Sequence, residues 1–288
     1  MLPGLLKAMR PHQWVKNLFV VAPLVFAKGL GDVEMVLRSA LAFVLFSFAA
    51  SAVYLLNDLA DLEADRAHPV KKNRPIASGA LPEKTARIAL AMLALVACGG
   101  ALMLGWKVLA TIAGYLLLQI AYTFKLKRVP YIDVLCIAAG FEFHVLSGTF
   151  ALDVPPSVYL LVVTFLLSAF LGFGKRMHEL QGTSFEKTRK VLSKYSPKTL
   201  TVLLQLTALA TTGTYVVYTL DPDTRALFGT DYLAATIVFT EFGVIRFMDL
   251  VRSESSADSP TEQMLRDWPF LVNLTLWAIA VVVVLYVT

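Results

Sequence analysis

The sequence predicts an all-α polytopic membrane protein, a bundle of nine transmembrane helices. Two observations support this prediction: the overall composition and a succession of long apolar runs. Of the 288 residues, 57% are hydrophobic and 16% are charged, and the mean hydropathy is +0.66. A soluble domain must cover its surface with more polar residues than this. The composition therefore excludes an ordinary soluble globular protein.

Nine apolar runs each have about the 17 to 25 residues that cross a bilayer core. They lie at residues 14–31, 35–56, 85–105, 108–124, 132–152, 157–174, 199–219, 231–250 and 268–287. No small-residue cleavage site follows the first run, so it is expected to be a retained span rather than a removed signal peptide. Since no separate soluble part is visible, we expect a single transmembrane domain over residues 1–288.

The long polar connections all fall on one side of the predicted bundle, and short turns fall on the other. These connections cover residues 57–84, 125–131, 175–198 and 251–267. Together with the N-terminus and their flanks they hold 21 of the 26 Lys and Arg residues; the other five are Lys28, Arg38, Lys107, Arg225 and Arg246. Excess positive charge marks the cytoplasmic face, so we predict a multi-pass cell-membrane protein with a cytoplasmic N-terminus and an external C-terminus. The net charge of +5 needs no nucleic-acid partner.

The stretch from Asn57 to Gly79 places several charged residues directly after an apolar run. On a helix, Asp58, Asp61 and Asp65 lie within about 60° of one another. Converging carboxylates repel unless a cation neutralises them, and a set of oxygen ligands suits Mg²⁺. We therefore predict that these three carboxylates bind Mg²⁺. Asn57, Asp58 and Asp61 are the predicted catalytic residues.

Basic residues follow the acids at once, and Lys71 and Arg74 are predicted to bind phosphate oxygens. The alternative is an acidic helix end followed by a basic loop that only obeys the charge rule for cytoplasmic loops. A solvated loop has no reason to align its acids at helical spacing. The stretch is therefore predicted to hold a metal-bound diphosphate at the membrane surface.

The pattern N-D-x-x-D-x-x-x-D at residues 57–65 resembles the first aspartate-rich motif of the UbiA superfamily of intramembrane prenyltransferases. Three further stretches, "RPHQWVKN", "HPVKKNRPIASG" and "GKRMHEL", resemble the decaprenyl-phosphate phosphoribosyltransferases of this superfamily. The resemblance runs over nearly the whole chain. It implies nine helices around a central cavity that opens to the cytoplasm and to lipid. It also implies a Mg²⁺-dependent enzyme of cell wall biosynthesis that joins 5-phosphoribosyl diphosphate to a polyprenyl phosphate.

The stretch "GKRMHEL" distinguishes two groups within the superfamily. Aromatic prenyltransferases carry a second aspartate-rich motif at the end of the sixth span, where this chain has Lys175, Arg176 and Glu179. Two cations in place of a metal cage predict direct binding of phosphate oxygens. The alternative is a basic helix end with an ion pair between Lys175 and Glu179, four residues apart.

The resemblance implies further substrate contacts at Lys16, Asn17, Tyr122, Lys127 and Asp133. An interfacial anchor made of Trp14 and Lys16 is an alternative reading of the first pair. The fifth span departs from the family, because His144 stands where an arginine is expected. His144 lies on the same helical face as Asp133 and either donates to a phosphate or packs in the bundle. This departure concerns which polyprenyl or sugar phosphate is bound.

Glu241, Arg246 and Asp249 are the other ionisable residues of an apolar run. Arg246 and Asp249 are three residues apart, so we expect them to pair with each other and to serve structure.

Two other functions remain open. One is transfer of a prenyl diphosphate to an aromatic or other acceptor by the same fold, and the other is a lipid or ion transporter without chemistry. Spans rich in Ala, Gly and Leu can also pack against copies of the chain, so a homo-oligomer is possible.

Overall fold

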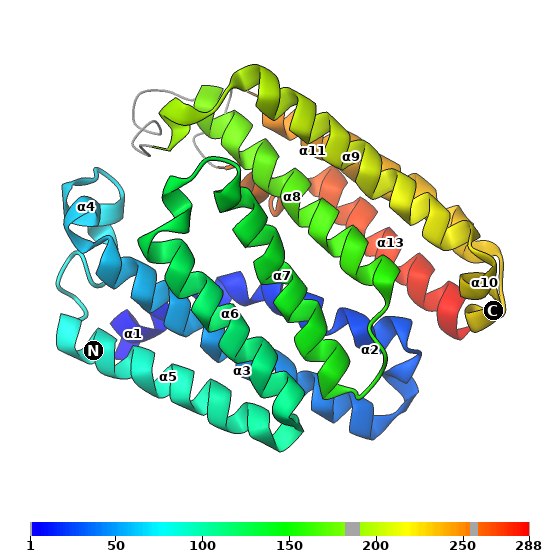
Figure 1. Cartoon of the computed structure of the whole chain (residues 1–288), viewed down its shortest axis with the longest axis horizontal. Helices are drawn as coiled ribbons and strands as arrows, with labels where there is room; N and C mark the ends of the chain where they lie inside the picture. The colour runs from blue at the N-terminus through cyan, green and yellow to red at the C-terminus, as the bar shows by residue number, and fades with distance from the viewer. Residues whose placement is uncertain (1, 182–190, 254–258, 288) are drawn as a thin grey trace. The chain divides into compact units, whose positions relative to one another are not determined.

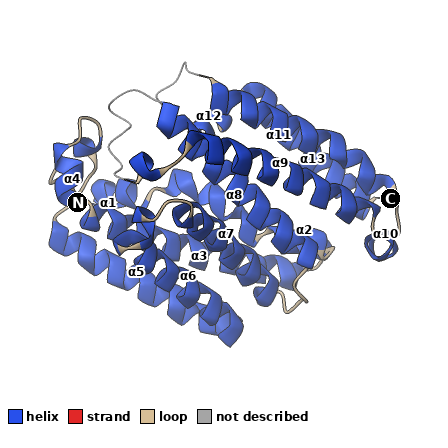
Figure 2. Cartoon of the chain, turned by 45° about the horizontal axis from the view of Figure 1, so that its top comes forward, coloured by secondary structure: helices blue, strands red, loops and turns tan. Residues whose placement is uncertain are grey.

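The computed structural model describes residues 2–181, 191–253 and 259–287 (Figure 1). These residues form helices joined by loops and turns, and the described ranges contain no strand (Figure 2). Parts of the predicted connections 175–198 and 251–267 lie outside the described residues. The chain divides into two compact units. Unit 1 comprises Met1–Lys127 and Gly140–Pro156, and unit 2 comprises Arg128–Ala139 and Ser157–Thr288.

Unit 1 contains three long helices, several short elements and the second part of a fourth long helix, α7. Its elements are α1 (Leu2–Met9), η1 (Pro11–Val20), α2 (Ala22–Phe26), η2 (Gly29–Gly31), α3 (Val33–Ala60), α4 (Leu62–Ala67), η3 (Lys71–Asn73), α5 (Glu83–Leu104), α6 (Trp106–Phe124) and the Gly140–Ala151 part of α7 (Ile132–Ala151). The short 3₁₀ element η4 (Leu126–Arg128) follows α6.

Helix α3 is the centre of unit 1, where it packs against α5, α6 and η1 (Figure 1). Asp32 precedes it, and the carboxylate of Asp32 accepts from the backbone N–H groups of Glu34 and Met35 and so caps the helix. At the same end, Arg38 donates to the carbonyl of Ala151, the last residue of α7, at 2.6 Å. A cation at the end of a helix satisfies a free carbonyl and opposes the helix dipole. Asp32 therefore caps the start of α3, and Arg38 joins this part of α3 to the end of α7.

A glycine sets the distance between α7 and η1. A β-carbon added at Gly148 would lie 1.9 Å from the carbonyl oxygen of Val20, a contact that no side chain can make. Gly99 of α5 offers the opposite case, because a β-carbon there would meet nothing within 4 Å. The close packing of α7 against η1 therefore requires Gly148, whereas Gly99 has room for a side chain.

We expect Gly148→Ala to lower the free energy of unfolding by about 2–3 kcal/mol, because the backbone of η1 must move away. Gly99→Ala should be neutral or stabilising by roughly 0.5–1 kcal/mol, since alanine is the better helix former. Thermal unfolding of both variants in one detergent checks this. Equal unfolding temperatures for the two would contradict the close approach.

Unit 2 is built from the first part of α7 and the helices that follow it. Its elements are the Ile132–Ala139 part of α7, α8 (Val158–Gln181), η6 (Leu192–Lys194), α9 (Pro197–Leu220), α10 (Pro222–Phe228), η7 (Tyr232–Thr236), α11 (Ile237–Arg252), α12 (Pro260–Met264) and α13 (Trp268–Tyr286). Helix α8 packs along α9, and α11 contacts α8, α9 and α13. Buried apolar residues from α7, α8, α9 and α11 form its core.

The prediction that Arg246 pairs with Asp249 is wrong. Arg246 donates to both carboxylate oxygens of Asp267, at 2.6 and 3.0 Å. Asp267 also caps α13 by accepting from the N–H of Phe270. The hydrogen bond from Arg246 lowers the pKa of the Asp267 carboxyl. Arg246 therefore joins α11 to the start of α13, a structural role made through a different partner from the one its spacing suggested.

Seven helices among the described residues are long and apolar enough to cross a membrane: α3, α5, α6, α7, α8, α9 and α13. The predicted span 14–31 is not one continuous helix, because η1, α2 and η2 divide it. Pro23 lacks the N–H that a continuous helix needs at that point, and Lys28 has a left-handed backbone with φ of 55°. In the predicted span 231–250, η7 leads into α11, which itself has 16 residues.

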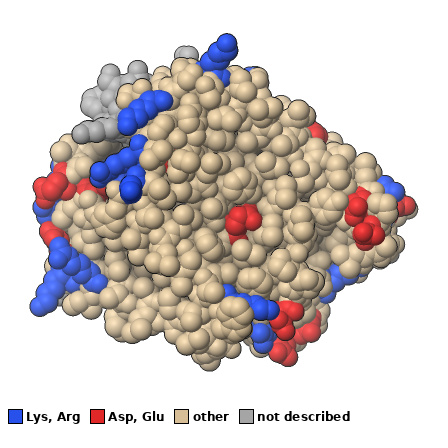
Figure 3. Space-filling model, viewed as in Figure 1, with Lys and Arg blue, Asp and Glu red and all other residues tan. Residues whose placement is uncertain are grey.

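The surface agrees with a membrane protein. Most of the face in Figure 3 carries no charged residue, and charged side chains gather near α4. Helix α5 exposes a row of large apolar side chains, at Ile88, Met92, Leu95 and Met103. An exposed apolar surface of this extent is expected to contact lipid.

Candidate functional site

The three predicted metal ligands lie where α3 gives way to α4. Helix α3 ends at Ala60, and Asp61 departs from helical geometry before α4 begins at Leu62. The backbone hydrogen bonds still continue in the helical pattern, from Asp61 to Asn57 and from Asp65 to Asp61. The acids therefore follow nearly helical spacing across a local distortion.

Asp58 and Asp65 share one cationic partner. Nη1 of Arg74 lies 3.1 Å from Oδ1 of Asp58 and 2.6 Å from Oδ2 of Asp65. Arg10, which precedes η1, donates to the same Oδ1 of Asp58 at 2.5 Å and lies over the ring of Tyr54. Both carboxylates are almost fully buried. This buried pair of acids is thus balanced by two guanidinium groups.

Asp61 is directed to a different partner. Its carboxylate accepts from Nζ of Lys127 at 2.6 and 2.9 Å, and 43% of its side chain remains exposed. No group of three or more His, Cys, Asp or Glu side chains able to hold a metal ion occurs in the described ranges. The predicted convergence of three carboxylates is therefore reduced to the pair Asp58 and Asp65, because the distortion at Asp61 turns that side chain toward Lys127.

The chemistry of these residues nevertheless fits a divalent cation. Oδ2 of Asp58 is buried and has no hydrogen-bond partner. A buried carboxylate oxygen without a partner costs free energy, and a hard cation would satisfy it. Asp58 is therefore the strongest candidate ligand, with Asp65 and Asp61 as further oxygen donors nearby.

Residues around the acids have contacts of their own. Oδ1 of Asn57 accepts from the hydroxyl of Thr123 at 2.5 Å, which joins α3 to α6. Tyr122 precedes Thr123 on α6 and is half-buried. The backbone N–H of Lys71 donates to Nδ1 of His68 at 3.2 Å, which shapes the loop that carries Arg74. Unit 1 thus brings together Asn57, the three acids, Arg74 and Lys127 among the predicted site residues.

Asn17 and His144 are brought together in the interior of unit 1. Nδ2 of Asn17 donates to Ser47 at 2.9 Å, and Oδ1 lies 3.1 Å from Nε2 of His144. Nδ1 of His144 lies 2.8 Å from the carbonyl of Gly140. Both ring nitrogens are therefore within hydrogen-bond distance of protein oxygens, which matches the packing alternative for His144. Lys16, one residue away, is exposed.

The predicted site residues of unit 2 form a second, deeply buried cluster. Arg176 on α8 is 1% exposed and Asp133 on α7 is fully buried. Arg176 donates to Asp133 at 2.8 Å and to Glu179 at 2.6 Å. The Arg176–Glu179 pair is three residues apart, and Lys175 is half-buried beside it. Arg176 is thus held between two carboxylates, so its guanidinium is occupied by protein partners.

Tyr195, between η6 and α9, completes this cluster. Its hydroxyl donates to Oδ1 of Asp133 and accepts from the backbone N–H of Tyr131 at 2.9 Å. Burial and the hydrogen bond to Asp133 raise the pKa of Tyr195, which keeps the hydroxyl protonated as a donor. Tyr131 has a left-handed backbone with φ of 67°, and its ring lies edge-on to that of Tyr195. The two tyrosines fix the start of α7.

Sequence reasoning missed Arg10, Thr123, Ser47 and Tyr195 as members of these clusters. Arg10 opens the stretch "RPHQWVKN", so its place in that motif was an available signal. Thr123 and Ser47 lie within apolar helices and belong to none of the motifs. Tyr195 lies in a polar connection, where a tyrosine gives no sequence signal for burial.

Comparison with known proteins agrees with these observations. The profile of the UbiA prenyltransferase family matches residues 18–274. The decaprenyl-phosphate phosphoribosyltransferase of Corynebacterium glutamicum is 33% identical over 99% of this chain and 87% of its own length. That of Mycolicibacterium smegmatis is 37% identical over 76% of this chain and 71% of its own length. The predicted resemblance to this superfamily, and to these phosphoribosyltransferases within it, is confirmed.

The fold is likewise shared with a solved structure. A UbiA homolog from Archaeoglobus fulgidus, solved bound to DMAPP and Mg²⁺, superposes with a TM-score of 0.74 at 17% identity and covers 99% of both chains. At this identity the likeness establishes the helical fold alone. Profile, relatives and fold agree, and this multi-pass membrane protein belongs to the UbiA prenyltransferase family.

Proposed function

We propose that the protein transfers the 5-phosphoribosyl group from 5-phosphoribosyl 1-diphosphate to a polyprenyl phosphate and releases diphosphate. The observation that carries this proposal is the similarity over 99% of the chain to a decaprenyl-phosphate phosphoribosyltransferase. The absence of a second aspartate-rich motif supports it, because Lys175 and Arg176 occupy that position in the sequence. The family profile covers residues 18–274, which supports one domain across both units.

Mg²⁺ is the proposed cofactor. Asp58, Asp61 and Asp65 would hold it, and it would neutralise the charge that develops on the departing diphosphate. The buried, unpartnered Oδ2 of Asp58 supports this assignment. The Archaeoglobus fulgidus homolog is a fold relative that binds Mg²⁺.

The cations around the acids have a complementary role in this proposal. Arg74 and Lys127 are paired with carboxylates in the described structure. A diphosphate bound with its metal carries both kinds of charge, so the metal suits the carboxylates while its phosphate oxygens suit Arg74 and Lys127. Lys71, from the same loop as Arg74, is a further proposed phosphate contact. The alternation of acids and bases thus matches a metal diphosphate better than a bare cation.

The remaining contacts are proposed from the resemblance. Lys175, Arg176 and Glu179 are assigned to the 5-phosphate and a ribose hydroxyl. Lys16, Asn17, Tyr122, Asp133 and His144 are assigned as supporting substrate contacts. Arg176 and Asp133 pair with each other and are both enclosed by protein, so we propose that this pair acts by positioning its neighbours.

No general base is needed for the proposed reaction. The attacking oxygen of a polyprenyl phosphate is already anionic, so its bond to the anomeric carbon forms while the bond to diphosphate breaks. The work of the site is to orient the two substrates and to stabilise charge. The polyprenyl chain would approach from membrane lipid, toward a cavity on the cytoplasmic side. We propose that side for the reaction because the long connections concentrate positive charge.

The test is transfer of label by the purified protein. With radiolabelled 5-phosphoribosyl diphosphate, decaprenyl phosphate and Mg²⁺, label should enter the organic phase, and a chelator should prevent it. A parallel reaction with labelled prenyl diphosphate and an aromatic acceptor should give no product. Product only in the parallel reaction would overturn the proposal in favour of prenyl transfer.

A further inference from the structure

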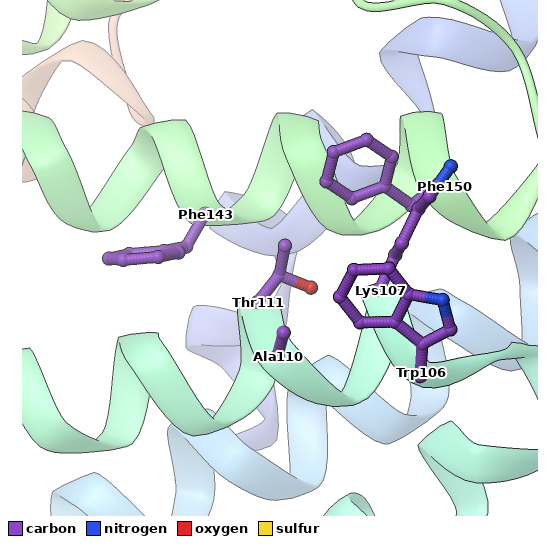
Figure 4. A pocket seen from close by; sticks show the side chains of 6 residues that line it. All are labelled: Trp106, Lys107, Ala110, Thr111, Phe143 and Phe150. Carbon is purple, nitrogen blue, oxygen red and sulfur yellow. The ribbon is translucent and has the colours of Figure 1, made fainter.

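A pocket of about 340 Å³ lies between the beginning of α6 and the last turns of α7, both within unit 1 (Figure 4). Its lining residues are Trp106, Lys107, Ala110, Thr111, Phe143 and Phe150. It is separate from the acid cluster. Thr123, which contacts Asn57, lies near the other end of α6, roughly 25 Å from Trp106 at about 1.5 Å per residue.

The lining is apolar with a polar edge. Three of its six lining residues are aromatic: Phe143, Phe150 and Trp106. Figure 4 shows Trp106, Lys107 and Phe150 close to one another, with the ring of Phe143 farther along on the other side of Thr111. The ammonium group of Lys107 lies 5.7 Å from the centre of the Phe150 ring. Thr111 already donates to the carbonyl of Val108, at 2.7 Å. Lys107 and the indole N–H of Trp106 are therefore the polar donors left to meet a ligand.

The charged residue that lines this pocket, Lys107, is positive. Within the described ranges, the ammonium group of Lys107 contacts an aromatic ring and pairs with no carboxylate. A cation that rests on a ring still has hydrogen-bond donors directed elsewhere. An anionic group at the rim would therefore complement Lys107, whereas a wholly apolar ligand would leave it without a counter-charge.

The pocket also lies beside the ends of two candidate spans, where lipid headgroups are expected. Candidate spans α6 and α7 begin and end here, at Trp106 and Ala151. Trp106 is 70% exposed. Tryptophan and lysine at the end of a span typically meet the polar edge of the bilayer, where phosphate groups lie above acyl chains. A ligand that fits this setting has a phosphate at the level of Lys107 and a hydrocarbon chain below it.

We propose that this pocket binds an anionic phospholipid, with its phosphate against Lys107 and one acyl chain between Phe143 and Phe150. It is a lipid site distinct from the acid cluster. An anionic headgroup is favoured over a zwitterionic one, because a choline or ethanolamine cation would bring a second positive charge toward Lys107.

The probe is quenching of tryptophan fluorescence by lipids with brominated chains, added to the purified full-length protein in a neutral detergent. The signal of Trp106 is the difference between the wild-type protein and Trp106→Phe. We expect brominated phosphatidylglycerol to half-quench this signal at a concentration about tenfold lower than brominated phosphatidylcholine, as one charged contact implies.

Lys107→Gln should abolish the tenfold preference, and Lys28→Gln, which also removes one positive charge from unit 1, should retain it. Ala110→Phe, which fills the pocket, should protect Trp106 from both lipids. Equal quenching by the two lipids in the wild-type protein would overturn the proposal. So would an unchanged preference in Lys107→Gln, or displacement of the lipid by inorganic phosphate alone, which would identify a phosphate site instead.

Discussion

Asp58→Asn should reduce phosphoribosyl transfer by about a thousandfold, the loss expected when charge stabilisation is removed from a transition state. The substitution keeps the size of the side chain and removes its negative charge. Oδ2, the buried oxygen that lacks a hydrogen-bond partner, becomes either an amide nitrogen or a weaker oxygen ligand. The initial rate of label transfer, measured over a range of Mg²⁺ concentrations, checks this prediction.

Glu63→Gln is the matched control for Asp58→Asn. Glu63 belongs to the same charged stretch, but its side chain is 87% exposed and pairs with neighbouring Arg66 on α4. An exposed pair of this kind contributes roughly 0–1 kcal/mol, so both activity and unfolding temperature should stay near the wild-type values. Equal losses of activity in the two variants would show that general charge, rather than Asp58 itself, supports the reaction.

A structural effect of Asp58→Asn must be separated from a chemical one. Arg10 and Arg74 both lose a charged partner at Asp58, although Arg74 keeps Asp65. Both guanidinium groups are partly exposed, so water can replace part of the lost interaction. A folded variant with normal Mg²⁺ dependence and full activity would remove Asp58 from the proposed site.

Much of the helical architecture was predictable because membrane spans leave a strong signal in sequence. Each of the seven long apolar helices overlaps one of the predicted runs, since about 20 apolar residues are needed to cross a bilayer. The run at 14–31 is also apolar, but it is broken at Val21, just before the Pro23 turn of α2, and again at Lys28. Hydropathy does not report backbone geometry, so a span count from hydropathy alone could not find this break.

The part of the candidate site that could be predicted is the part in which helical spacing brings two side chains close together. Asp58 and Asp65 are seven residues apart and do share a partner, Arg74. The local distortion at Asp61 has no Gly or Pro to announce it, so the separation of Asp61 from the pair was not predictable. The partner Lys127 comes from a distant segment and depends on tertiary packing.

The burial of Arg176 could not be predicted from the sequence either. A basic group at the end of a span normally snorkels to the interface, which made Arg176 a reasonable phosphate contact. Its enclosure depends on Asp133 of α7 and on Tyr195, each far from it in sequence. Such clusters form only when the core of unit 2 assembles.

Arg176→Met should therefore lower the free energy of unfolding by about 3–5 kcal/mol, the typical result of leaving one member of a buried ion pair unpaired. Asp133 is fully buried and would keep its hydrogen bonds from Tyr195 and from the backbone N–H of Val134 without a cationic partner in Arg176. Thermal unfolding in detergent measures the loss. Arg87→Met is the control, because Arg87 is 71% exposed and pairs with Glu83 at the surface, so a loss of roughly 0–1 kcal/mol is expected.

The double variant Arg176→Met with Asp133→Leu distinguishes an ion pair from a ligand-binding arginine. Removing both charges should restore most of the lost stability, because an apolar pair avoids the cost of burying charge. A guanidinium that served mainly to bind phosphate would behave differently: Arg176→Met alone would unfold near the wild-type temperature and would raise the KM for 5-phosphoribosyl diphosphate. The enclosure of Arg176 between Asp133 and Glu179 favours the first outcome, since a phosphate would have to compete with two carboxylates already in contact.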